Sequence, residues 1–306
     1  TQDDLTRRDL PRYEQGVLQA VDERLEARFD DVVAHADRAP LAGAVARLDE
    51  DARLRRGTAS RIDDAHLVIG QARVLELGIE PHERRTHGAV EGVHRDSIIE
   101  ETADMAWTLL MAVARRLIEG DAMVRSGVTF PGCQSPYLVG SQVHGKTLGI
   151  VGMGKIGRAM ARRAKGFNMK VLFCRRTRDR ETERELGAVQ TSLEELLRES
   201  DFVSLHAAYS PETHHLIGAK ELDMMKPTAF LINTARGQIV DQDALIDALR
   251  RKKIAGAGLD VYKSEPQPNL PGDFLRMKNV VLTPHLGSAV AEKREIMANT
   301  VADIFL

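Results

Sequence analysis

Three residues in the C-terminal third of the chain have side chains that could carry out acid/base chemistry on a carboxylate-bearing molecule. His285, in the segment TPHLGS, follows an apolar run and can exchange a proton near neutral pH. Glu265 could hydrogen-bond the other ring nitrogen, which would fix the tautomer and favour the protonated ring. Arg236, in the segment NTARG, offers a planar fork of donors that suits a carboxylate. We interpret these three residues as a candidate catalytic set.

A glycine-rich turn lies in the middle of the chain. An apolar run at 147–151 leads into GMGKIG at 152–157, and a helical pattern and a second apolar run at 169–173 follow. This strand–turn–helix–strand context makes G-x-G-x-x-G a credible dinucleotide site rather than an ordinary turn. The pyrophosphate would sit on the helix N-terminus. The candidate cofactor-binding residues here are Gly152, Gly154, Lys155, Ile156 and Gly157.

The end of the second apolar run indicates which dinucleotide is bound. An NAD site normally has an acidic residue there. This chain instead continues as Cys174-Arg175-Arg176-Thr177-Arg178, with no acidic residue before Asp179. Arginine suits a 2′-phosphate, so we expect NADP, with NAD possible, and take Arg175, Arg176 and Thr177 as candidate contacts. The alternative is that the arginines form a solvated basic loop.

Short apolar runs alternate with helical patterns through the rest of the chain. Further runs lie at 201–206, 229–234, 257–261 and 280–283. Buried strands separated by helices predict an α/β protein with a doubly wound parallel sheet. Ligands of such sheets bind beyond the carboxyl ends of the strands. The residues at those ends, most of them polar, are Gly152, Arg175, His206, 233–236, Asp260 and His285.

Helices are expected on either side of these runs. The residues from Ile98 to Leu117 have a wide apolar face typical of one long buried helix. The glycines and prolines of 120–140 predict an irregular connection. Thr191 and Glu194 have the spacing of a capping box, and 241–253 predict a helix. Residues 1–97 are less regular. Helical patterns at 11–29 and 41–48 and a short strand at 31–34 indicate a smaller α/β domain.

Composition and charge narrow the possible classes of protein and partner. The 306 residues carry a formal net charge of −2, which favours neither nucleic acid nor an acidic membrane as a partner. No apolar run is long enough to span a bilayer, and the N-terminal segment is too polar for a signal peptide. Two unpaired cysteines, Cys133 and Cys174, favour a reduced, cytoplasmic location. No metal-ligand spacing is present, and His214 and His215, being adjacent, would point to opposite sides of a strand.

The motifs GMGKIG, INTARG, LDVYKSEP and TPHLGSA, in this order and spacing, resemble the D-isomer-specific 2-hydroxyacid dehydrogenases. The resemblance covers about residues 93–300. It does not extend to 60–92, which lack the family's glycine-rich substrate loop. It implies a Rossmann cofactor domain at 98–286, a smaller flavodoxin-like α/β substrate domain at 1–97 plus 287–306, and a homodimer formed largely through the cofactor domains.

The resemblance also implies roles for individual residues. His285 would be the acid/base, Glu265 its partner and Arg236 the carboxylate binder, while Asp260 would contact the nicotinamide amide group. Thr234 and Ala235 would line the nicotinamide. Thr102, His206 and the loop after it would meet the phosphates or ribose. That loop contributes Thr213.

The implied function is hydride transfer between NADP(H) and a small 2-keto or 2-hydroxy acid of the glyoxylate, hydroxypyruvate and D-glycerate class. Two alternatives remain open. One is a phosphite or formate dehydrogenase of the same fold, although formate dehydrogenases carry glutamine where this chain has Glu265. The other is a non-enzymatic, NAD(H)-sensing protein similar to the transcriptional corepressors of this fold, in which the same residues would serve binding alone.

Overall fold

The computed structural model of the chain describes residues 98–129, 137–266 and 269–293. The chain divides into two compact units, Ile98–Ala289 and Thr1–Ser97 with Val290–Leu306. Nearly all described residues belong to the first unit. The expected substrate domain, with its expected helices at 11–29 and 41–48 and strand at 31–34, lies outside the described residues, apart from 287–293.

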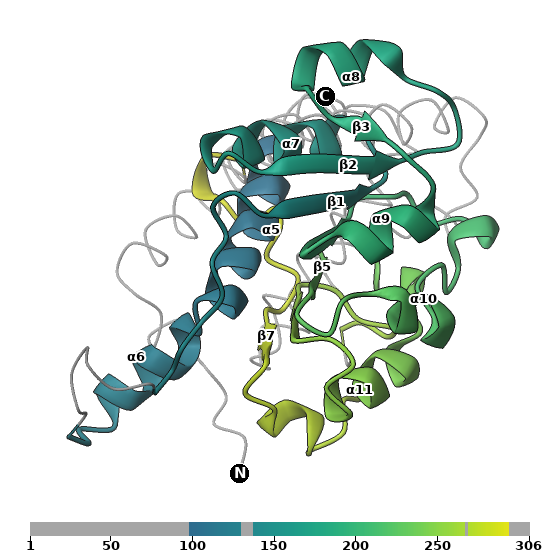
Figure 1. Cartoon of the computed structure of the whole chain (residues 1–306). Coiled ribbons are helices and arrows are strands. Elements are labelled where there is room, and N and C mark those ends of the chain that lie inside the picture. Colours follow the sequence, from purple (N-terminus) through teal and green to yellow (C-terminus); the bar gives the residue numbers. More distant parts are fainter. Residues whose placement is uncertain (1–97, 130–136, 267–268, 294–306) are drawn as a thin grey trace, which may run out of the picture. The chain divides into compact units, whose positions relative to one another are not determined.

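The sheet has seven strands, all parallel, in the order β3-β2-β1-β4-β5-β6-β7 (Figure 1). The first strand, β1, lies inside the sheet; β2 and β3 are added on one side of it, and the chain then crosses back to add β4 to β7 on the other side. This is the predicted doubly wound parallel sheet. The strands are β1 (Thr147–Val151), β2 (Lys170–Cys174), β3 (Val189–Gln190), β4 (Phe202–Leu205), β5 (Phe230–Asn233), β6 (Gly256–Leu259) and β7 (Val280–Leu282).

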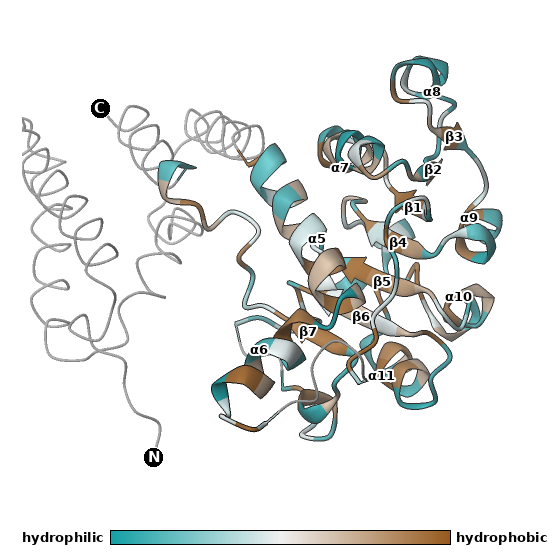
Figure 2. Ribbon diagram, turned by 60° about the vertical axis from the view of Figure 1, so that its left-hand side comes forward, coloured by the Kyte–Doolittle hydropathy of each residue, from teal (hydrophilic) through white to brown (hydrophobic). Residues whose placement is uncertain are grey.

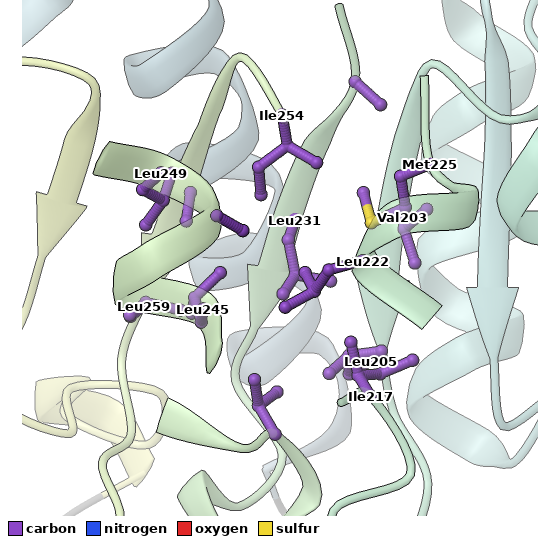
Figure 3. Packing of buried hydrophobic residues seen from close by; sticks show 14 of the residues in the cluster. Val203, Leu205, Ile217, Leu222, Met225, Leu231, Leu245, Leu249, Ile254 and Leu259 are labelled. Carbon is purple, nitrogen blue, oxygen red and sulfur yellow. The ribbon is translucent and has the colours of Figure 1, made fainter. Parts of the chain in front are cut away.

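Helices cover both faces of the sheet (Figure 2). One face carries α5 (Ile99–Ala114) and α7 (Lys155–Gly166), and the other carries α9 (Leu193–Glu199), α10 (Ala219–Met224) and α11 (Gln242–Arg250). Side chains alternate along β5: Phe230 and Ile232 join the core under α5 and α7, whereas Leu231 joins the core under α10 and α11 (Figure 3). Burial on both faces explains why the strands read as unbroken apolar runs.

The expected long helix at 98–117 is α5, which ends earlier than expected and is followed by a second helix. α5 ends at Ala114, Arg116 adopts the left-handed conformation with φ 54°, and α6 runs from Leu117 to Arg125. The break coincides with the point where packing ends, because α5 contributes eight buried residues and α6 none. Both helices have helical periodicity, so the sequence does not reveal the break. The expectation that 120–140 is irregular is also wrong at its start, since Gly120 lies within α6.

The cap of α9 differs by one residue from the expected capping box. The N-cap is Ser192, whose Oγ accepts a hydrogen bond from the N–H of Glu195 at 3.1 Å. Thr191 instead directs its hydroxyl to the Glu195 carboxylate. The two residues able to cap this helix are adjacent, and only the backbone direction distinguishes them, which is why the sequence pattern alone misplaces the cap.

Several short elements were not anticipated. They are α8 (Arg180–Leu186), β3, α10 and the 3-10 helices η3 (Pro211–Thr213), η4 (Gly237–Ile239) and η5 (Phe274–Arg276). The expected helix at 241–253 is α11, which ends at Arg250, with Asp241 as its N-cap. In the described part of the chain, no helix has the length and apolar character required to cross a membrane.

The Ser192 cap provides a test of local stability. We expect Ser192→Ala to lower the free energy of unfolding by about 1 kcal/mol, because the N–H of Glu195 loses its acceptor. Ser192→Asp should retain most of the stability, since a carboxylate also caps a helix. Urea unfolding followed by circular dichroism measures both. Thr191→Ala is the matched control, and an equal loss from this variant would contradict the assignment of the cap.

Candidate active site at the carboxyl ends of the strands

The last residues of six strands form one row across the sheet. Val151 is paired with Cys174 and with Leu205, and the row continues through Asn233, Leu259 and Leu282. The residues that come directly after this row therefore share one edge of the sheet. They are Gly152, Arg175, His206, Thr234, Asp260 and Thr283. Five of these six were predicted site residues, which places the candidate site along this edge.

The glycine turn between β1 and α7 is required by close backbone contacts. Gly152 has φ 97°, and a Cβ atom there would lie 2.5 Å from the backbone nitrogen of Ala207 after β4. A Cβ atom on Gly157 would lie 2.4 Å from the carbonyl oxygen of Gly152, so this glycine lets α7 pack against the turn. Gly154 differs, because no atom of the described residues lies within 4 Å of its Cβ position. The first and third glycines thus close the turn, and the second leaves open space above it.

The N-terminus of α7 faces this open space. Gly154 is the N-cap, and Lys155 and Ile156 are the first two helical residues. Among the described residues no side chain caps this end, and the first turn holds no acid. A helix N-terminus of this kind favours an anion through its N–H groups and its dipole.

The end of β2 is more crowded than its sequence indicates. Asp179 lies four residues after Arg175, yet its carboxylate folds back to form an ion pair with Arg175 and also meets Arg158 of α7 at 3.1 Å. Hydrogen bonds from the backbone N–H and the hydroxyl of Thr182 lower the pKa of Asp179 to about 2. Negative charge therefore lies beside Arg175, although no acidic residue directly follows the strand.

The other two candidates of this loop have different surroundings. Arg176 is exposed, and its charge helps to lower the pKa of Glu212, after the larger effect of a hydrogen bond from Ser210. This effect places the loop after β2 near the loop after β4. The carbonyl of Thr177 accepts a hydrogen bond from the Gln190 amide at 3.1 Å.

The loop after β4 holds its candidates by local bonds. The His206 ring accepts or donates a hydrogen bond with Ser204 at 2.8 Å. The hydroxyl of Thr213 donates to the carbonyl of Ala208 at 2.9 Å and accepts from the N–H of Ser210 at 2.7 Å. Both side chains thus shape the loop itself.

His214 and His215 do not point to opposite sides as expected. They lie after η3 in a turn rather than in a strand, and His215 has φ 51°. Their rings stack with centroids 4.0 Å apart. No group of three or more histidine, cysteine or acidic side chains suited to a metal ion occurs within residues 98–129, 137–266 and 269–293.

The segment after β5 is braced by Asn233, a residue for which no role was expected. Its side-chain oxygen accepts from the N–H of Ala235 at 3.0 Å, and its amide nitrogen donates to the carbonyl of Arg236 at 3.0 Å. An asparagine before a turn commonly bonds its own backbone in this way, which is the signal that could have identified it. The Arg236 guanidinium is exposed and bonds only the carbonyl of Ala235, at 2.6 Å, within the described chain.

The structure brings Glu265 and His285 together. Oε2 of Glu265 lies 2.6 Å from Nδ1 of His285, while Oε1 accepts a hydrogen bond from the N–H of Tyr262 at 2.8 Å. About half of the His285 side chain is exposed, 47% against 30% for Glu265. The ring is thus held on one nitrogen and accessible from outside.

Close contacts connect this pair to the Arg236 segment. A Cβ atom at Gly237 would lie 1.9 Å from the carbonyl carbon of Tyr262, so only glycine allows the two loops to meet. The hydroxyl of Tyr262 then donates to the carbonyl of Thr283 at 2.9 Å, two residues before His285. Tyr262 therefore links the loops after β5, β6 and β7. Nothing in its sequence position indicated this role.

Asp260 and Thr102 lie beside each other at the same edge. Asp260 is fully buried and accepts hydrogen bonds from the backbone N–H groups of Leu286 and Gly287, both at 2.8 Å. The hydroxyl of Thr102, in the first turns of α5, is 2.8 Å from the carbonyl of Ile98 and 3.3 Å from that of Gly287. Both predicted cofactor contacts therefore also hold the turn that carries His285.

Three features of this edge fit a dinucleotide. The space above Gly154 and the open N-terminus of α7 suit a pyrophosphate. The buried hydroxyl of Thr234 has no hydrogen-bond partner among the described residues. Buried polar groups are normally satisfied, so this hydroxyl is available to bond a ligand atom.

The environment of His206 predicts a pH dependence of stability. Burial lowers the pKa of His206 from 6.5 to about 4, so the folded chain keeps the ring neutral where the unfolded chain protonates it. Stability from this group is therefore complete above pH 6.5 and falls as the pH drops towards 4. We expect a loss of about 2 kcal/mol between pH 6.5 and pH 5. Urea unfolding at both pH values should show this loss, and His206→Gln should abolish it; an equal loss in the variant would contradict the assignment.

Comparison with known proteins agrees with this geometry. Residues 107–287 match the model of the family "D-isomer specific 2-hydroxyacid dehydrogenase, NAD binding domain". A glyoxylate reductase from Thermococcus litoralis is 53% identical over 208 residues, which are 67% of this chain and 62% of the relative. The chain thus spans less than two thirds of the length of that relative.

Two solved structures are also similar. One is an NADPH-dependent glyoxylate/hydroxypyruvate reductase from Sinorhizobium meliloti in complex with NADP and malonate, with 34% identity, a TM-score of 0.61, and coverage of 68% of this chain and 63% of that one. The other is D-lactate dehydrogenase from Aquifex aeolicus complexed with NAD and lactic acid, with 31% identity, a TM-score of 0.62, and coverage of 68% and 66%. The chain belongs to the D-isomer specific 2-hydroxyacid dehydrogenases, and residues 107–287 are its NAD binding domain.

Proposed function

We propose that the protein transfers a hydride between NADP(H) and a small 2-keto or 2-hydroxy acid of the glyoxylate, hydroxypyruvate and D-glycerate class. The observation that carries the proposal is the His285–Glu265 pair, at 2.6 Å, on the same sheet edge as the glycine turn. The names of the relatives, glyoxylate reductase and glyoxylate/hydroxypyruvate reductase, favour this substrate class.

Each residue of the candidate set has a defined task in this reaction. Bound NADPH supplies the hydride to the carbonyl carbon of the keto acid. His285, protonated and oriented through Nδ1 by Glu265, donates a proton from Nε2 to the carbonyl oxygen. Arg236 binds the substrate carboxylate with its planar fork. Arg236 and His285 also stabilise the negative charge that develops on the carbonyl oxygen, because their donors are in place before the reaction.

The preference for NADP is the finer part of the proposal. Arg175, Arg176 and Thr177 follow β2, where a 2′-phosphate would lie, and the similar reductase from Sinorhizobium meliloti binds NADP. Asp179 already pairs with Arg175, so the exposed Arg176 is the more available cation. We propose that both arginines contact the 2′-phosphate and that NAD also binds, with lower affinity.

We further propose that the chain forms a homodimer through the surface of α6. This helix has no buried residue, and Figure 2 shows hydrophobic colour on parts of it. Five of the large apolar side chains that are more than half exposed lie on α6 and in the segments after it. They are Leu117, Ile118, Val124, Val128 and Val139. A second copy of the chain would bury this surface, because large exposed apolar patches mark interaction sites.

Substitution of His285 tests the reaction. His285→Gln should lower turnover of glyoxylate or hydroxypyruvate by about 10²- to 10⁴-fold, because the proton donor is lost. NADPH binding, followed by its fluorescence, should stay unchanged. His144→Gln is the control, since His144 lies before β1 and outside the candidate site. Retained turnover in His285→Gln would refute the role of His285, and NADPH binding without turnover in the wild type would favour a sensor instead.

Substitution of Arg175 tests the cofactor preference. Arg175→Asp should shift the preference from NADP towards NAD by about 10-fold or more, because a charge-assisted contact to the 2′-phosphate becomes a repulsion. Arg176→Ala should act in the same direction. Kd values for NADPH and NADH measure the shift. Arg178→Ala is the matched control, since Arg178 pairs with Glu183 at 2.9 Å. An unchanged preference in both test variants would overturn the proposal.

Substitution on α6 tests the homodimer. Ile118→Asp with Val124→Asp should convert the dimer to a monomer, because two carboxylates would be buried in the interface. Light scattering after size-exclusion chromatography gives the mass. Leu275→Asp, at an exposed apolar residue of η5, is the matched control and should remain dimeric. A wild-type monomer, or a dimer that survives both α6 substitutions, would contradict this surface as the interface.

A further inference from the structure

Asp260 is a buried carboxylate held by donors from a single turn. Its exposed fraction is 0%, and no ion pair to it is found among the described residues. Oδ1 accepts from the N–H of Leu286 at 2.8 Å and from the hydroxyl of Thr283 at 2.5 Å, and Oδ2 accepts from the N–H of Gly287 at 2.8 Å. A buried carboxylate requires such hydrogen bonds, and here all three come from the residues around His285.

The backbone of His285 has an unusual conformation. Its φ is 57°, in the left-handed region that non-glycine residues rarely adopt. The chain reverses at this residue, so the next two N–H groups, of Leu286 and Gly287, both reach the Asp260 carboxylate. The two hydrogen bonds to the carboxylate thus offset the free-energy cost of the left-handed conformation at His285.

The other side of the turn rests on α5. A Cβ atom on Gly287 would lie 3.2 Å from Oδ2 of Asp260 and 3.6 Å from Cγ2 of Thr102. The hydroxyl of Thr102 is 3.3 Å from the carbonyl of Gly287. The turn is therefore enclosed between the end of β6 and the first turns of α5, and the side chain of His285 leaves it towards Glu265.

We propose that Asp260 is a positioning residue: its carboxylate holds the turn from Thr283 to Gly287 so that the His285 ring is set against Glu265. The inference rests on the proposed catalytic role of His285 and deepens it. Oδ2 accepts a single hydrogen bond from the described chain and retains acceptor capacity, but a contact with the nicotinamide amide group would also require this carboxylate, 0% exposed, to become accessible.

Asp260→Asn is the informative substitution because it changes one atom without changing the volume. If the amide oxygen replaces Oδ1, the NH₂ group meets the N–H of Gly287; if the amide is reversed, it meets the N–H of Leu286. Either orientation sets a donor against a donor. Thr283→Val removes only the hydroxyl donor to Oδ1 and should cause a smaller change in the same direction.

The test uses the full chain and two readouts. The first is the ¹⁵N NMR signal of the His285 imidazole, assigned by its loss in His285→Gln, which reports the hydrogen bond at Nδ1. In Asp260→Asn we expect this signal to move towards that of a ring exchanging between tautomers. The second is the pH profile of glyoxylate turnover with NADPH. We expect kcat to fall by about 10-fold or more and the acidic and basic limbs to shift.

Controls separate positioning from general stability. Asp273→Asn changes an exposed carboxylate that pairs with Arg250 at 2.5 Å, and both readouts should be unchanged. If Asp260→Asn and Thr283→Val lower the melting temperature but leave the His285 signal and the pH profile as in the wild type, the proposal is overturned. Should Asp260→Asn not fold, Thr283→Val decides by the same two readouts.

The outcome is distinguishable from failure of the proposed reaction. If the wild-type protein does not oxidise NADPH with glyoxylate or hydroxypyruvate, the proposed function is wrong. The NMR signal of His285 still decides whether Asp260 positions the ring, because that measurement needs no substrate.

Discussion

Parallel pairing with the strand ends in register determines where this site lies. Val151, Cys174, Leu205, Asn233 and Leu259 are aligned across the sheet, so the residue after each strand emerges at the same edge. A cofactor lying along that edge would meet backbone groups and side chains from six separate segments. The apolar cores on both faces maintain the register, because a shift by one residue would exchange the two faces of every strand.

Backbone contacts rather than long side chains then set the distances between the loops. Gly152 meets the segment after β4, and Gly237 meets Tyr262, in both cases at separations that exclude a Cβ atom. These contacts bring together loops that are far apart in the sequence. The Glu265 and His285 side chains therefore have only a short distance to span. Their hydrogen bond at 2.6 Å follows from the positions of the two backbone segments.

The end of β2 shows how charge in space differs from charge along the sequence. A run of arginines reads as a site for a phosphate, yet the fold returns Asp179 to Arg175 and Arg158. A 2′-phosphate would therefore compete with a carboxylate that is already hydrogen-bonded to Thr182. If the arginines contact a 2′-phosphate as proposed, the preference for NADP over NAD would depend on how strongly they pair with that phosphate rather than with Asp179.

Local patterns were sufficient to predict the parallel sheet, the glycine turn, the family and the side chains at the strand ends. Apolar runs, glycine spacing and motifs read in order carry this information, because each involves residues that are close together in the chain. The break after α5, the return of Asp179 and the support of the His285 turn by Asp260 became visible in three dimensions alone. The break depends on where packing ends. The other two include contacts beyond the range of local periodicity, because Arg158 lies 21 residues from Asp179 and Gly287 lies 27 residues from Asp260.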